Sequence, residues 1–380
     1  MVYITAERAG VYVHLPFCPY ICPYCDFAKW AWDDARAARY LEALRAELAS
    51  APVVEARTLF FGGGTPSMYG ADEIAGLVGA VRARFALPPG AEITAEANPD
   101  PLLATRIPGF REAGVNRLSI GVQSFDPREA RVLGRRHTPR DVENAIRAAR
   151  ASGFDNVSVD LIFGVPGQTE ASWAASLDAA VALGVEHVSC YGLTIEEGTP
   201  YATWFARDPS AFADDTLEAR LYALAMAKLR AAGFEHYEIS NWAKPGFRSQ
   251  HNSLYWANEP YLGLGVGAAS YLGGVRSTHT RDLDAYLDAA QAGRPIPGES
   301  ERLEGAAQAG EAIMLALRTA EGVDLARFRE RYGIDVRERY GDVVGELVAA
   351  GMLAADPAHV RLTERGRFVA NDVCGAFLAD

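Results

Sequence analysis

The sequence lacks several features that would place it in a special class of protein. Cysteine is scarce, with 5 residues in 380, so a disulfide-stapled scaffold is excluded. The longest notable uncharged stretch, Leu262–Val275, is short and rich in glycine, so no transmembrane segment is predicted. Met1–Arg8 shows no basic segment followed by an apolar one, which argues against a signal peptide. We therefore expect a cytoplasmic protein, and leave open a peripheral contact with a membrane.

An excess of basic residues is also missing. The 37 lysines and arginines against 49 aspartates and glutamates give a net charge of −12, so no nucleic-acid partner is expected. The hydrophobic fraction of 49% and the charged fraction of 23% are ordinary for globular proteins, which excludes disordered, collagen-like and coiled-coil chains. The length predicts about two domains.

The first half of the chain alternates apolar runs with amphipathic helical segments. The strand-like runs are Val11–Phe17, Thr58–Gly62, Glu92–Ala97, Arg117–Val122, Val157–Phe163 and His187–Leu193. The helical segments between them include Ala35–Ala49, Asp72–Phe85, Arg140–Ser152 and Ser172–Leu183. Strands separated by helices of this length predict right-handed βαβ units and a parallel sheet. Six units in succession favour an α/β partial TIM barrel, (β/α)6, over a doubly wound sheet.

The second half predicts additional strands and a small domain. A helix at Asp214–Ala232 is followed by a strand at Tyr237–Trp242, a glycine-rich segment and a linker near Gly293–Gly298. Helices are predicted at 304–318, 325–332 and 336–350, apolar runs at 352–354 and 360–362, and a last helix from Thr363. This order is typical of a winged-helix-like α+β module. We expect a core barrel at 1–235, a barrel extension at 236–293 and a C-terminal domain at 298–380.

Three of the five cysteines, Cys18, Cys22 and Cys25, form a CxxxCxxC motif directly after the first predicted strand. In a reducing compartment such a group indicates metal binding or catalysis. Three thiolates from one loop can hold a [4Fe–4S] cluster and leave one iron open for an outside ligand. A structural zinc site completed by His14 is the alternative. The position at the carboxyl end of a barrel strand favours the cluster.

Polar and glycine residues end the following strands. Gly62–Thr65 ends the second, where glycines let the backbone approach a ligand. Glu96 and Gln123 end the third and fourth strands, and Asp160 lies inside the apolar fifth. A carboxylate in such a run must be paired or bind a ligand. An ion pair with a barrel arginine is the structural alternative for Asp160.

The CxxxCxxC motif resembles that of the radical S-adenosylmethionine (SAM) superfamily. The wider sequence is similar to the oxygen-independent coproporphyrinogen III oxidase family in its motifs YVHLPFC (12–18), GGGTP (62–66), GVQSF (121–125), VDLIFGVPG (159–167) and TIEEGTP (194–200). The resemblance implies that SAM chelates the open iron and is cleaved to a 5′-deoxyadenosyl radical by an electron donor. It also implies a set of SAM contacts, which are Tyr12, Tyr24, Gly63, Gly64, Thr65, Glu96, Gln123, Arg135 and Asp160. Arg136 is an alternative to its neighbour Arg135.

One departure separates this chain from the oxidase branch, whose cysteine motif resembles CxxxCxxCxC. Phe27 occupies the position of the fourth cysteine, as in the haem chaperone branch of the same family. The sequence HNSLYW (251–256) is similar to a motif associated with haem in that branch. His251 offers an axial ligand, and Tyr255 offers flat apolar surface. A packing histidine with Asn252 capping a loop is the alternative.

These features lead to one expected function and two alternatives. We expect a haem chaperone that carries a [4Fe–4S] cluster and SAM, contacts haem through His251, Asn252 and Tyr255, and can deliver haem to haemoproteins. The main alternative is coproporphyrinogen III oxidase in porphyrin biosynthesis, which Phe27 disfavours. A different radical SAM reaction is the third possibility. A homodimer is left open.

Overall fold

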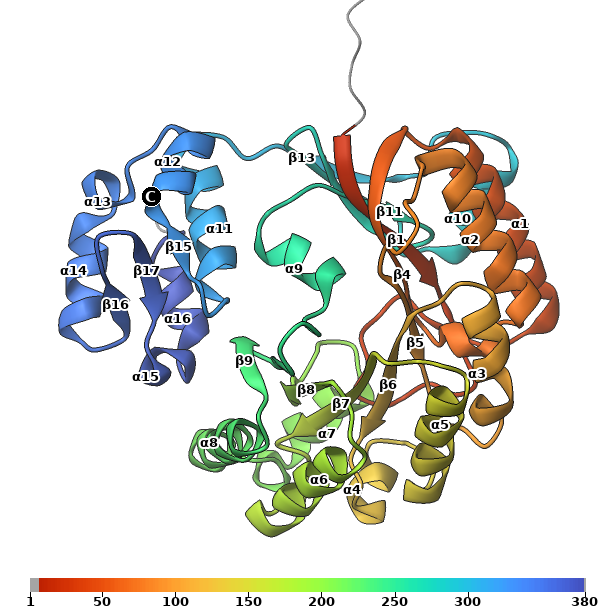
Figure 1. The fold of residues 1–380 in the computed structure, drawn as a ribbon, viewed down its shortest axis with the longest axis horizontal. Coiled ribbons are helices and arrows are strands. Elements are labelled where there is room, and N and C mark those ends of the chain that lie inside the picture. The colour runs from red at the N-terminus through yellow and green to blue at the C-terminus, as the bar shows by residue number, and fades with distance from the viewer. Residues whose placement is uncertain (1–6, 379–380) are drawn as a thin grey trace, which may run out of the picture.

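A computed structural model describes residues 7–378. They form one curved 12-stranded sheet covered by helices, and a smaller group of helices and strands beside it (Figure 1). The strand order is β14-β13-β12-β11-β1-β4-β5-β6-β7-β8-β10-β9, so the sheet is an open, partial barrel. Residues 1–6 and 379–380, at the ends of the expected first and last domains, lie outside the described residues, as does most of the segment examined for a signal peptide.

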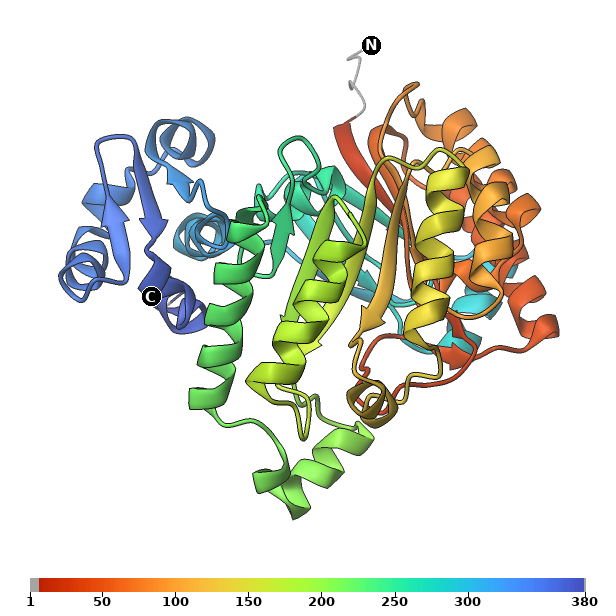
Figure 2. The same ribbon diagram turned by 60° about the horizontal axis from the view of Figure 1, so that its bottom comes forward.

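Six parallel neighbours form the centre of the sheet. They are β1 (Glu7–Leu15), β4 (Val54–Gly63), β5 (Ile93–Ala97), β6 (Arg117–Gln123), β7 (Val157–Phe163) and β8 (His187–Gly192). The helices that follow β1, β4, β5, β6 and β7 are α1 (Asp34–Ser50), α2 (Ala71–Phe85), α3 (Leu103–Glu112), α4 (Pro127–Val132), α5 (Pro139–Ala151) and α6 (Glu170–Ala182). They cover the outer face of the sheet (Figure 2). The predicted α/β partial barrel is confirmed.

Helix α5 illustrates how the sequence produces these elements. Thr138 caps its first turn by accepting a hydrogen bond from the backbone N–H of Asp141. Val142, Ile146 and Ala149 recur at helical spacing and are buried against the sheet. Each βα unit therefore buries its apolar stripe outside the barrel and leaves the inner face of the strands free for polar residues.

Further strands extend both edges. At one edge β10 (Asn241–Ala243) and β9 (Glu235–Glu238) are antiparallel, so the single strand expected at Tyr237–Trp242 is a hairpin that turns at Ile239 and Ser240. At the other edge β11 (Tyr261–Leu264) pairs in parallel with β1. The elements beyond it are β12 (Ala269–Leu272), β13 (Val275–His279) and β14 (Gly298–Glu301). The remaining helices of this part are α7 (Pro200–Arg207), α8 (Asp215–Ala231), α9 (Gln250–Trp256) and α10 (Leu283–Gln291), with short turns η1 (Pro66–Met68) and η2 (Pro209–Ala211).

A second hydrophobic core begins with α11 (Gly305–Leu317) and ends at Phe377. Its sheet has the order β15-β17-β16, from Val323–Asp324, His359–Leu362 and Leu353–Ala355. The helices are α12 (Leu325–Tyr332), α13 (Val336–Arg339), α14 (Gly341–Ala349), α15 (Glu364–Arg367) and α16 (Ala370–Gly375). The small α+β domain is thus confirmed. Because β14 belongs to the large sheet, we propose that this domain starts near 305.

Two predicted helices of the small domain are interrupted. The helix expected at 336–350 breaks at Tyr340, whose backbone is not helical and which precedes the flexible Gly341. The last helix, expected from Thr363, is divided between α15 and α16. None of the helices within residues 7–378 is long and apolar enough to cross a membrane.

Candidate functional site

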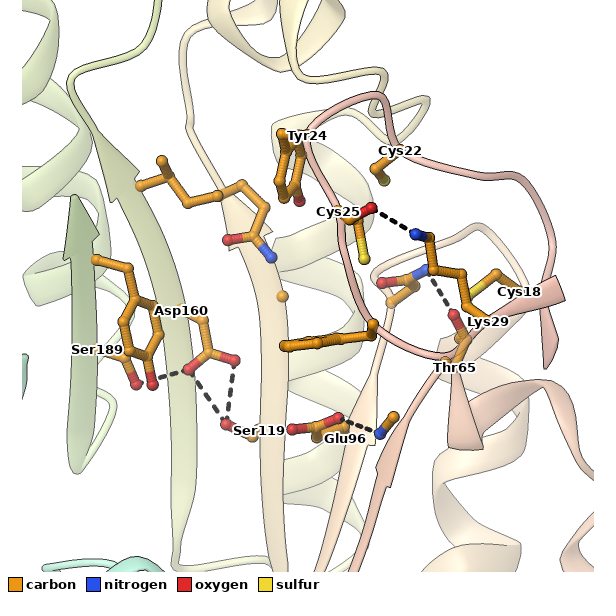
Figure 3. A pocket seen from close by; sticks show the side chains of 18 of the residues that line it. Cys18, Cys22, Tyr24, Cys25, Lys29, Thr65, Glu96, Ser119, Asp160 and Ser189 are labelled. Carbon is orange, nitrogen blue, oxygen red and sulfur yellow. Dashed lines mark hydrogen bonds between the residues drawn. The ribbon is translucent and has the colours of Figure 1, made fainter. Parts of the chain in front are cut away.

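A cavity of about 420 Å³ lies inside the barrel, beneath the loop that carries the three cysteines (Figure 3). Strands β4 to β8 line it, with the cysteine loop as its roof. Alternation along the strands determines which residues reach it. On β6, Arg117, Ser119, Gly121 and Gln123 line the cavity, whereas the residues between them are buried among the helices. The inner face of the barrel is therefore polar although its strands are largely apolar in sequence.

The roof loop is held by short backbone contacts. Strand β2 (Phe17–Cys18) pairs with β3 (Trp30–Ala31), which closes the loop at its base. Within the loop, the N–H of Cys25 donates to the carbonyl of Cys22 at 3.2 Å. The thiols of Cys18, Cys22 and Cys25 are partly exposed, and all three residues border the cavity.

The geometry of these cysteines fits a cluster better than a single zinc ion. Within residues 7–378, no three His, Cys, Asp or Glu side chains are placed to hold one metal ion. In an iron–sulfur cluster the thiolates bind different iron atoms, so they need not meet at one point. His14 is also not free to complete a zinc site. Its Nε2 donates to the Ala28 carbonyl at 2.7 Å and its Nδ1 accepts from the Tyr12 hydroxyl at 2.9 Å.

Two glycines of β4 and the loop after it, Gly63 and Gly64 (the Gly63–Gly64 strap), form the cavity wall next to the cysteine loop together with Glu96. Gly63 has a φ of +108°, and a Cβ on Gly64 would lie 2.5 Å from the backbone carbonyl of Pro16, so both positions require glycine. The N–H of Gly63 donates to the Glu96 carboxylate at 3.1 Å. Burial and the nearby charge of Asp160 raise the pKa of Glu96 to about 7. Glu96 therefore changes charge near neutral pH.

Asp160 points into the cavity from β7 (Figure 3). It accepts hydrogen bonds from the Ser189 hydroxyl at 2.7 Å and from the Ser119 hydroxyl at 3.1 Å. Burial raises its pKa, and these hydroxyls together with the charge of Arg117 oppose that rise. No arginine in the described part of the chain lies within 4.0 Å of Asp160, so the ion pair considered as an alternative is not formed.

Arg135, not Arg136, faces the cavity. Arg135 is buried and donates to Asn98 at 2.8 Å, to the Gly121 carbonyl and to the Cys22 sulfur at 3.7 Å. Arg136 is exposed and lies over the ring of Tyr20 at 4.8 Å. Gln123 ends β6 with a φ of +67°, which is uncommon for a residue other than glycine.

The HNSLYW segment forms α9, between the barrel and the small domain (Figure 1). His251 is buried outside the cavity, with Nδ1 bonded to the Thr58 hydroxyl at 2.7 Å and Nε2 to the Tyr255 hydroxyl at 2.8 Å. Burial lowers the pKa of His251 to about 3, so it is neutral. Of the three residues expected to contact haem, only Asn252 lines the cavity.

These contacts predict a large stability effect at His251. We expect His251→Ala to lower the free energy of unfolding by about 2–4 kcal/mol, because it opens a cavity and removes hydrogen-bond partners of Thr58 and Tyr255. Denaturant unfolding followed by circular dichroism measures the effect, with the partly exposed His359→Ala as a control that stays near wild type. Unchanged stability together with lost haem binding would instead make His251 a direct ligand.

The cavity brings together most of the residues expected from the sequence. Those that line it are Cys18, Cys22, Tyr24, Cys25, Gly63, Gly64, Thr65, Glu96, Gln123, Arg135, Asp160 and Asn252. Tyr12, His251 and Tyr255 lie behind its wall. The sequence reasoning missed Arg117, Ser119, Ser189 and Lys29, which also line it. Arg117 and Ser119 lie an even number of residues before Gln123 on the same strand, so their side chains share its face; this alternation is the signal that could have identified them.

Comparisons with known proteins agree with this architecture. Residues 12–180 match the family model described as the Radical SAM superfamily, and residues 303–369 match the HemN C-terminal domain. The chain is similar to the solved structure of coproporphyrinogen III oxidase (HemN) from Escherichia coli, with a TM-score of 0.85 over 99% of this chain and 91% of that one. At 22% identity this likeness shows the fold alone.

The curated relatives give a finer result. The chain is 36% identical to the heme chaperone HemW of Bacillus subtilis over 98% of this chain and 99% of the relative. It is 39% identical to the HemW of Mycobacterium tuberculosis over 99% and 96% of the two chains. It is 34% identical to the HemW of Escherichia coli over 98% of each. The chain therefore belongs to the radical SAM superfamily and, within it, to the family of the heme chaperone HemW proteins.

Proposed function

We propose that this protein is a haem chaperone: it binds haem and delivers it to haem-accepting proteins, with a [4Fe–4S] cluster and SAM as its cofactors. The observation that carries the proposal is the sequence identity of 34–39%, over nearly the full length of the chain, to proteins named heme chaperone HemW. Phe27 supports it. In the motif of the oxidase branch, which resembles CxxxCxxCxC, a fourth cysteine occupies this position. In this chain the residue there is 64% exposed beside the cavity.

The cavity residues divide into two groups in this proposal. Cys18, Cys22 and Cys25 hold the cluster, which would supply one-electron reduction to SAM bound at its open iron. The residues proposed to hold SAM are Tyr24, Gly63, Gly64, Thr65, Glu96, Gln123, Arg135 and Asp160, with Tyr12 supporting them from behind the wall. The Gly63–Gly64 strap permits close approach, and the carboxylates of Glu96 and Asp160 favour the cationic groups of the ligand.

For haem, the position of α9 favours a supporting role for the histidine. Asn252 reaches the cavity directly, whereas His251 and Tyr255 are hydrogen-bonded to each other behind it. We propose that these two residues keep α9 against β4 and so fix the wall from which Asn252 projects. Direct ligation by His251 would require breaking its bonds to Thr58 and Tyr255.

The titration of Glu96 gives a pH-dependent prediction. Above pH 7 its carboxylate is ionised and attracts the ligand, and below pH 7 it is protonated and resembles glutamine. The ratio of SAM affinities between wild type and Glu96→Gln should therefore fall about tenfold from pH 8 to pH 6. Calorimetry on cluster-loaded protein measures it, and comparison with the variant cancels any titration of SAM itself. A ratio that does not change with pH would remove Glu96 from the SAM site.

Haem delivery is tested by mixing the haem-loaded protein with an apo-haemoprotein and following the appearance of the acceptor's Soret spectrum. We expect transfer faster than from serum albumin carrying the same amount of haem. Haem binding no tighter than to an unrelated acidic protein of similar size, or transfer no faster than from albumin, would overturn the proposal.

A further inference from the structure

Arg135 carries a buried positive charge against the cysteine loop. It lies shortly after α4 and is 8% exposed. Its Nη2 donates to the Asn98 side chain at 2.8 Å and to the carbonyl of Gly121, and these two acceptors fix the orientation of the guanidinium. Its Nη1 donates to the Cys22 sulfur at 3.7 Å. The charged group is therefore directed at one of the three cysteines of the loop.

No carboxylate of the protein balances this charge within residues 7–378. No aspartate or glutamate oxygen in that part of the chain lies within 4.0 Å of the nitrogens of Arg135. The two cavity carboxylates, Glu96 and Asp160, instead accept hydrogen bonds from backbone and hydroxyl donors. Burying a cation without an anionic partner is costly. The negative charge that balances Arg135 is therefore expected from the sulfur it contacts or from a group bound there.

An iron–sulfur cluster on the three cysteines supplies this negative charge. Cysteine binds iron as the thiolate, so Cys22 becomes an anion when it holds the cluster. A cluster held by three thiolates is negatively charged as a whole, and reduction makes it more negative. A cation that donates to a ligating sulfur therefore favours the reduced form over the oxidised form. Burial strengthens this effect, because little water is present to screen the charge of Arg135.

We propose that Arg135 is the counter-charge of the cluster and raises its reduction potential through the contact with Cys22. The inference rests on the [4Fe–4S] cluster of the proposed function and is independent of haem. The reaction concerned is the transfer of one electron from an external reductant to the cluster, which moves no proton. Arg135 acts in this way on the cluster itself, in addition to its proposed contact with SAM.

Arg136 provides a matched control in the next position of the chain. It carries the same charge but is exposed, and its guanidinium lies over the ring of Tyr20 at 4.8 Å. A charge surrounded by water is screened by the solvent and by salt. The two arginines therefore differ in burial and in the contact with Cys22, and only the charge of Arg135 is expected to act strongly on the cluster.

The test measures the midpoint potential of the cluster in reconstituted protein without SAM, so that a contact between Arg135 and SAM does not enter the result. Wild type, Arg135→Gln, Arg135→Lys and Arg136→Gln are titrated anaerobically with dithionite and redox mediators, at low and at high salt. Electron paramagnetic resonance quantifies the reduced cluster. Thermal melting, together with iron and sulfide analysis, establishes that each variant is folded and loaded.

We expect Arg135→Gln to lower the equilibrium constant for reduction about tenfold or more, which corresponds to about 59 mV for one electron. Arg135→Lys keeps the charge without the guanidinium fork and should lower the constant about threefold. Arg136→Gln should change it less than about twofold. The effect of Arg135→Gln should persist at high salt, because a buried charge is screened only weakly.

An unchanged potential in Arg135→Gln, or equal shifts in Arg135→Gln and Arg135→Lys, would overturn the proposal. A shift in Arg136→Gln as large as that in Arg135→Gln would also overturn it. If Arg135→Gln does not take up the cluster, the threefold decrease in Arg135→Lys carries the test, and a wild-type potential in that variant would contradict the proposal. A wild-type chain that assembles no cluster would instead refute the proposed cofactor, and a failure to bind haem would leave this measurement unaffected.

Discussion

Replacing Cys18, Cys22 and Cys25 together by alanine should remove the iron–sulfur cluster completely. After anaerobic reconstitution we expect about four iron and four sulfide per wild-type chain, the content of one [4Fe–4S] cluster, and almost none in the triple variant. The reason is geometric, because these three thiols border the cavity from one loop. Iron and sulfide analysis, together with the visible absorption of the cluster, measures the effect.

Cys190 and Cys374 provide the matched control. Both are buried away from the loop, Cys190 on β8 and Cys374 in the core of the small domain. Their alanine variants should keep the wild-type iron and sulfide content. A triple variant that retained its iron and sulfide would show that the cluster is bound elsewhere.

Asp160→Ala should weaken SAM binding ten- to a hundred-fold. The change removes a buried carboxylate and leaves the hydroxyls of Ser119 and Ser189 without their acceptor, a loss of about 1.5–3 kcal/mol. Calorimetry on cluster-loaded protein measures the affinity. Asp155→Ala, an exposed aspartate just before the same strand, should bind SAM as wild type does. Equal affinities in all three proteins would place Asp160 outside the SAM site.

The sequence predicted the parallel core well because each strand there is a short apolar run between helices. The run Val157–Phe163 coincides with β7, and helix 325–332 coincides with α12. Additional strands were expected, but the positions of β11 to β14 were not predicted, since glycines and polar residues interrupt their apolar pattern and their pairing depends on the free edge of β1. Local periodicity carries no information about such an edge.

The residues of the candidate site were also predicted only in part. The cysteines, Glu96 and Asp160 were predicted because their type and position are unusual in an apolar strand or short loop. His251 was predicted to contact haem, but the pattern could not show that Thr58, far away in sequence, binds its ring. Arg117 was missed for the opposite reason. An arginine at the start of a strand is unremarkable until the fold buries it beneath the cavity.

The proposed role as a haem chaperone is tested most directly by product analysis with coproporphyrinogen III. Protein whose cluster content and SAM binding have been verified is reduced anaerobically, supplied with SAM and coproporphyrinogen III, and its porphyrin products are separated by chromatography. A second portion of the same preparation is titrated with haem. We expect stable haem binding and no more protoporphyrinogen IX than the triple cysteine variant yields. Formation of protoporphyrinogen IX over successive turnovers would contradict the account and make the protein an oxidase.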